Sequence, residues 1–129
     1  MNKILVEVSI GELLDKISIL EIKKEKIKDV NKLNFISDEH SILKDQLDKN
    51  VKTDQKLEEL FKLLKDINAK LWVIEDDKRQ CEKEKNFSEK FIKLSRDVHF
   101  LNDDRALIKL QINNHTGSKI KEIKEYTSY

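Results

Sequence analysis

Several polar side chains in the second half of the chain occupy positions where a helical protein normally places its core. On a helical wheel of residues 53–85, the apolar stripe that ends at Leu71 continues into carboxylates, amides and an arginine. On residues 88–116, Arg105 falls at the centre of the apolar stripe. The candidate ligand-binding residues are Asn68, Trp72, Glu75, Arg79, Glu82, Asn102, Arg105, Lys109 and Asn113.

These residue types suit the recognition of a small anionic or sugar ligand. Arginine offers a planar, bidentate grip on an anion, asparagine offers amide donors, and tryptophan offers a flat wall. A second interpretation is a buried ion-pair network that fixes the register of the helices without necessarily adding stability. In that interpretation Arg105 must meet a carboxylate, with Glu75 as the first choice and Glu82 as the second. The third interpretation is that these side chains are simply solvated.

Other patterns that could carry chemistry are weaker. Glu12 and Asp15 lie three residues apart, and an acidic cluster spans residues 75–77, as in helical proteins that hold Mg²⁺ between paired carboxylates. The paired acidic motifs of all-helical pyrophosphatases are not reproduced, so we expect no metal and no cofactor. His40 is expected to be a satisfied core histidine and Cys81 a small buried apolar group. Without a glycine-rich phosphate loop or a nucleophile elbow, no catalytic residue can be assigned.

Composition predicts one small helical domain over residues 1–129. The chain has no proline and two glycines, so few joints are expected between long helices. The formal net charge of +1 gives no overall attraction for nucleic acid. The longest apolar run, Ile4 to Val6, is too short to insert into a membrane or to form a signal peptide. A single cysteine favours a cytoplasmic location.

Periodicity predicts an all-α, antiparallel four-helix arrangement with short extended termini. Helices are expected over residues 9–30, 32–50, 53–85 and 88–116, with Ser9, Thr53 and Ser88 as N-caps and Gly117 as the terminator of the last. The last two should form a long hairpin, with the first two packed across it. Trp72 should be largely buried. The tail at residues 119–123 should either lie beside residues 3–8 or form one more helical turn.

Three blocks of the sequence resemble a bacterial family of short proteins of unknown function. They are residues 9–23, residues 71–82, and a spaced set from Phe91 to Ser118 that includes Ser95, Arg96 and Arg105. The family pattern has alanine and tyrosine where this chain has Ser95 and His99. Members often occur near genes for surface-polysaccharide assembly and glycosyl transfer, so the resemblance implies an association with that process but no mechanism.

The favoured function is therefore a binding or accessory protein, non-catalytic, serving surface-glycan or lipopolysaccharide assembly. One alternative is a small enzyme acting on a phosphorylated or carboxylated metabolite. Another is a structural homodimer built around a buried ion-pair network. An open pocket whose hydrogen-bond donors are unpaired would favour ligand binding. Candidate residues that neutralise one another's charge would favour the structural interpretation. An acid or base with a shifted pKa inside the pocket would favour an enzyme.

Overall fold

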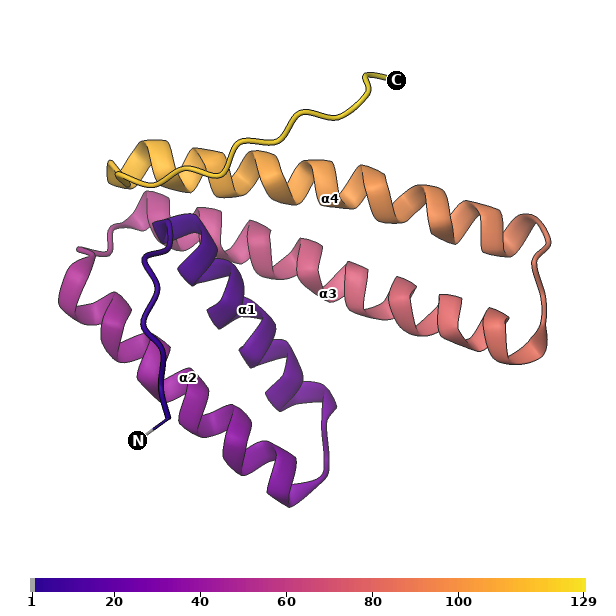
Figure 1. Ribbon diagram of the computed structural model, residues 1–129, viewed down its shortest axis with the longest axis horizontal. Coiled ribbons are helices and arrows are strands. Elements are labelled where there is room, and N and C mark those ends of the chain that lie inside the picture. Colours follow the sequence, from indigo (N-terminus) through magenta and orange to yellow (C-terminus); the bar gives the residue numbers. More distant parts are fainter. Residues whose placement is uncertain (1) are drawn as a thin grey trace.

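Four helices make up about three quarters of the protein. The computed structural model describes residues 2–129, and no strand occurs among them. The helices are α1 (Ile10–Lys26), α2 (Val30–Asn50), α3 (Gln55–Glu84) and α4 (Glu89–Thr116). The all-α class and the long α3–α4 hairpin predicted from the sequence are confirmed (Figure 1).

Each helix begins at a residue whose side chain can satisfy the free backbone N–H groups of the first turn. The Ser9 hydroxyl accepts from the N–H of Glu12 at 3.0 Å, as expected. In a capping box the Glu12 carboxylate would in turn accept from the backbone N–H of Ser9. That bond does not form among the described residues, because the Glu12 carboxylate accepts from Lys109 instead. The cap of α3 is Asp54 rather than Thr53, because its carboxylate accepts from the N–H of Leu57 at 2.8 Å.

The join between α1 and α2 lies a few residues earlier than the sequence predicts, whereas the ends of α3 and α4 agree with the prediction to within a residue. α1 ends at Lys26 rather than Val30, because the Asp29 carboxylate caps α2 and residues 27–29 form the join. α3 ends in a left-handed residue, Lys85, at φ 56°, and the N–H of Asn86 closes the turn on the carbonyl of Cys81 at 2.9 Å. Gly117 ends α4 at φ 69°, as predicted.

α1 is the central helix of the core. It contacts α2, α3 and α4, whereas α2 approaches only α1 closely, so the expected packing of both helices across the hairpin holds for α1 alone (Figure 1). The core lies between α1, the first half of α3, the end of α4 and Leu47 of α2. Its buried members are Leu14, Ile17, Leu47, Leu57, Leu60, Leu64, Ile108 and Ile112.

Both termini are extended, but they lie on different parts of the molecule. The C-terminal segment after Gly117 runs back along α4, whereas residues 3–8 lie near α1 and α2 (Figure 1). The pairing of the tail with residues 3–8 is therefore wrong, and so is the extra helical turn. Several contacts with α4 hold the tail. Glu122 accepts from Lys109, and the Lys121 ammonium donates to the amide oxygen of Asn114 at 2.8 Å. The Tyr129 ring packs near His99 and Phe100, and its hydroxyl donates to Asp103.

Candidate functional site

A cleft of about 390 Å³ opens where α1 diverges from the α3–α4 hairpin. α1 contributes Ile19 and α4 contributes Arg105. The α3 residues that line it are Asn68, Leu71, Trp72, Glu75, Asp76 and Arg79. Five of the nine candidate residues therefore lie around one cleft: Asn68, Trp72, Glu75, Arg79 and Arg105.

Arg105 enters the cleft without a carboxylate partner. It is half-buried, and its guanidinium donates one hydrogen bond, to the amide oxygen of Asn68 at 3.4 Å. No carboxylate among residues 2–129 lies within 4 Å of it, so the predicted ion pair with Glu75 or Glu82 is wrong. Glu82 is exposed nearer the tip of the hairpin. Arginine carries five N–H donors, so most of those on Arg105 are free for a ligand.

Asn68 is held in one orientation by α1. Its amide nitrogen donates to the Asp15 carboxylate at 2.7 Å and to the Ser18 hydroxyl at 2.8 Å. All three side chains are buried, and the Ser18 hydroxyl donates to the backbone carbonyl of Asp15 at 2.8 Å. Because both amide hydrogens are engaged, the amide oxygen turns toward Arg105. The buried amide thus positions the guanidinium at the inner end of the cleft.

Trp72 and Glu75 form the part of the wall that continues along α3. Both are half-buried: each side chain is mostly covered, as expected for Trp72, but keeps an exposed edge in the cleft. α1 leaves the hairpin at this level, so it does not enclose the indole completely. Its N–H makes no hydrogen bond within the described part of the chain and remains available in the cleft. Arg79 and Asp76 are exposed at the outer rim.

Lys109 belongs to a second polar cluster, next to the N-terminus of α1. Its ammonium contacts Glu12, lies 3.6 Å from Asp15 and donates to Glu122 at 3.2 Å. Burial by itself lowers the pKa of Lys109, but the hydrogen bond to Glu12 and the charge of Asp15 outweigh it, so the pKa is raised. Lys109 is therefore a structural cation that neutralises carboxylates of α1 and the tail.

Asn113 belongs to the same second cluster. Its amide oxygen accepts from the N–H of Gly11 at 2.7 Å, and a Cβ atom at Gly11 would lie 2.7 Å from the carbonyl oxygen of Lys109. The glycine allows α1 and α4 to approach closely here. Lys109 and Asn113 thus hold the helices together outside the cleft, and Glu82 and Asn102 are not among its lining residues.

The sequence interpretation missed the role of α1 in organising this polar core. Gly11, Asp15, Ser18 and Ile22 recur at helical spacing on one face of α1 and are all buried. Asp15 had been considered only as a metal ligand, and among residues 2–129 no group of three His, Cys, Asp or Glu side chains could hold a metal ion. The sequence does contain a signal for this role: Gly11, Asp15 and Ser18 form a row of small and polar residues beside the apolar row of Leu14 and Ile17.

The two histidines with polar partners and the single cysteine have structural surroundings. His40 is half-buried and lies 3.3 Å from the Glu21 carboxylate, and His115 lies 2.9 Å from Asp54 at the start of α3. Cys81 is buried between α3 and α4, as predicted. Across residues 2–129, none of the helices has the length and apolar character needed to cross a bilayer.

Fold and site together define a small all-helical protein whose cleft has binding groups of both charges. The chain belongs to the family of unknown function DUF6165, which matches residues 4–129. No curated protein and no solved structure matches the chain. The family membership predicted from the three sequence blocks is thereby confirmed, as that of a family of unknown function.

Proposed function

We propose that this protein is a non-catalytic binding or accessory protein whose cleft between α1, α3 and α4 holds a small anionic sugar. The observation that carries the proposal is Arg105, a half-buried guanidinium that lines a cleft of about 390 Å³ and has no carboxylate within 4 Å among the described residues. Cavities of this size, at the lower end of the usual range, suit small metabolites.

The lining residues suit a ligand that has an anionic group at one end and a hydroxyl-bearing ring at the other. Arg105, and Arg79 at the rim, can grip a phosphate or carboxylate through charge-assisted hydrogen bonds. Glu75 and Asp76 can accept hydrogen bonds from sugar hydroxyls, and the Trp72 ring offers an apolar surface to a sugar ring. Because the two acids and two arginines cancel in charge, the cleft favours a sugar phosphate or sugar acid over a polyanion.

Such a ligand suits the association with surface-glycan or lipopolysaccharide assembly that the family resemblance implies. In this proposal the protein works in the bacterial cytoplasm and binds or presents an activated or acidic sugar for that assembly. It does so without metal or cofactor.

The alternatives have less support. An enzyme needs an acid or base tuned for proton transfer in the cleft, whereas the pKa shifts of Lys109 and Glu122 lie outside it and favour the charged forms. The structural interpretation depended on an Arg105–Glu75 ion pair, which does not form. The groups that fix the helix register are instead Asp15 and Lys109.

A thermal-shift screen with matched arginine variants tests the proposal. The probes are glucose 1-phosphate, glucuronate, UDP-glucose, inorganic phosphate and neutral glucose. At ten times its Kd, a bound ligand stabilises the fold by about 1.4 kcal/mol, which for a domain of this size raises Tm by about 5 °C. Arg105→Gln should abolish the rise, and Arg96→Gln should keep it, because Arg96 is exposed and does not line the cleft. The proposal fails if no anionic sugar raises Tm, or if both variants respond like the parent protein.

A further inference from the structure

The outer part of the α3–α4 hairpin, here called the distal arm, comprises residues 72–84 and 89–104. It extends beyond α1 and consists of two helices, against which the end of the C-terminal tail packs through Tyr129 (Figure 1). Cys81 is the single buried residue of the distal arm, and α4 has no buried residue before Ile108. A two-helix hairpin cannot enclose a core by itself, because each helix has only one neighbour.

The distal arm exposes large apolar side chains despite this lack of cover. Val73, Ile92 and Phe100 are each 40% or more exposed. Exposed apolar surface that gathers in one place commonly marks a protein–protein contact, and Val73 and Phe100 line the same groove. The side chains are spread along both helices, as they are in half of a four-helix bundle.

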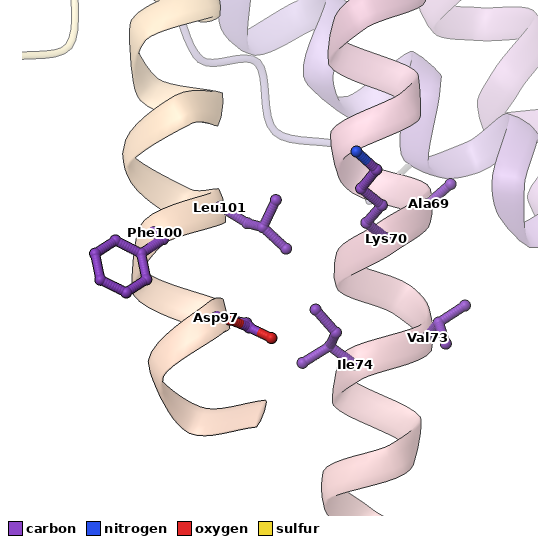
Figure 2. A pocket seen from close by; sticks show the side chains of 7 residues that line it. All are labelled: Ala69, Lys70, Val73, Ile74, Asp97, Phe100 and Leu101. Carbon is purple, nitrogen blue, oxygen red and sulfur yellow. The ribbon is translucent and has the colours of Figure 1, made fainter. Parts of the chain in front are cut away.

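A groove of about 650 Å³ runs between the two helices of the distal arm and the adjoining turn of α3. Its centre is apolar, with Val73, Ile74, Phe100 and Leu101, and its charged lining residues are Lys70 and Asp97. Figure 2 shows Lys70 on α3 and Asp97 on α4, displaced from each other along the groove. On α3, Val73 and Lys70 point about 100° or more away from Trp72 and Arg79, so the groove and the ligand cleft open on different sides.

We propose that this groove is the interface of a homodimer, in which the distal arms of two copies pack face to face. A two-fold axis perpendicular to the line that joins Lys70 and Asp97 brings the lysine of each copy opposite the aspartate of the other. The same apolar groove then meets itself, as a two-fold interface requires. The surface is thus complementary to itself in both charge and hydrophobicity.

The present surroundings of Lys70 and Asp97 leave both residues able to pair with a second copy. Asp97 lies 2.7 Å from the Lys93 ammonium on its own helix, in an exposed i, i+4 pair. Exposed pairs of this kind contribute little, so Asp97 can interact with a second copy at little cost. Lys70 is exposed and forms no ion pair with the described residues.

A charge-swap experiment on the full chain tests the interface. Sedimentation equilibrium should show a dimer for the parent protein. Lys70→Glu and Asp97→Lys each place like charges opposite one another and should weaken dimerisation ~10-fold or more. The double variant K70E/D97K restores both pairs and should dimerise within about threefold of the parent protein. Lys62→Glu, an exposed position of α3 outside the groove, should change nothing.

Circular dichroism separates loss of the interface from loss of the fold, because all three sites are on the helix surface and the helical signal should persist. A parent protein that stays monomeric at several hundred micromolar would overturn the proposal. So would a dimer that both single variants leave intact, or one that the double variant fails to restore. These results leave the proposed ligand site untouched, since the cleft is tested separately on the other side of the hairpin.

Discussion

Arg105 and Lys109 are one turn apart on α4, yet their charges are handled differently. Lys109 is buried and contacts three carboxylates, from Glu12, Asp15 and Glu122. Arg105 is half-buried and contacts one neutral amide oxygen. A cation that is neutralised internally supports the fold, whereas one that is left unpaired in a cleft is available to a ligand. This contrast at two residues carries the functional argument.

Arg105→Leu should therefore cost little stability. The loss is one long hydrogen bond to Asn68, worth about 1 kcal/mol, rather than the roughly 3–5 kcal/mol expected for breaking a buried ion pair. Urea unfolding of the variant and its parent measures the difference. A loss of more than about 3 kcal/mol in the free energy of unfolding would show that Arg105 neutralises a carboxylate in solution. Arg105 would then be a structural residue and not a ligand-binding one.

Lys109→Met should be much more damaging, because it leaves the buried Asp15 carboxylate without its cation. The expected cost is roughly 3–5 kcal/mol. Removing both charges, in Lys109→Met with Asp15→Asn, should cost clearly less than the sum of the single changes. Additive losses in the double-mutant cycle would mean that the two side chains do not interact.

At the scale of the helices, the α1–α4 contact depends on a missing side chain. In an uncrowded helix Gly11→Ala would gain about 1 kcal/mol. Here the new Cβ would meet the backbone oxygen of Lys109, so the helices must separate, and we expect a net loss of roughly 1–3 kcal/mol. Thermal unfolding measures the sign, and a gain in Tm would contradict the close approach. Gly117→Ala is the control. A Cβ at Gly117 would meet nothing within 4 Å, but the residue has a positive φ, so this variant shows the effect of backbone strain alone.

The sequence predicted the number, order and antiparallel hairpin of the helices, because apolar periodicity and the lack of proline are local signals. It also predicted Ser9 and Gly117 as helix boundaries. The partners of Arg105 could not be predicted, because a helical wheel gives the direction of a side chain but not how far a third helix extends. α1 leaves the hairpin at Trp72, which leaves one edge of that indole uncovered and the cleft open.

Five candidate residues that the wheels selected do surround one cleft, whereas Lys109 and Asn113 lie in a neighbouring cluster. Asp15 joins the two, since it contacts both Asn68 and Lys109. Both groups looked alike in sequence, since each continues an apolar stripe with polar residues. They differ in what α1 presents to them: Asp15 and Ser18 reach Asn68, while Glu12 and Gly11 reach the end of α4. That distinction requires the packing of α1, which single-helix periodicity does not contain.

At the scale of the whole molecule, the C-terminal tail is fastened through a titratable contact. Burial alone would raise the pKa of Glu122, but Lys109 and Lys124 lower it below its ordinary 4.5. Its contribution is thus complete above the unfolded-state pKa and is lost as the pH falls through the lower folded-state value. Lys109, whose pKa is raised, stays charged until the pH exceeds its ordinary 10.5.

Acidification should therefore loosen the tail before it unfolds the helices. We expect the backbone order of residues 119–129, measured by ¹⁵N relaxation, to fall once the pH drops through the folded-state pKa of Glu122, which lies below the ordinary 4.5. Glu122→Gln should show the loosened tail at neutral pH already. A tail that stays ordered in this variant would mean that the contacts of Lys121 and Tyr129 are sufficient to hold it.

The most direct test of the central claim uses Trp72, the only tryptophan of the chain and a wall of the cleft. Titration with glucose 1-phosphate should produce a saturable change in its fluorescence, because the ligand displaces water from the exposed edge of the indole. Arg105→Gln should remove the change, and Arg96→Gln should preserve it. A signal that stays flat to millimolar ligand, or one that Arg105→Gln leaves intact, would contradict an anion-binding cleft at this site.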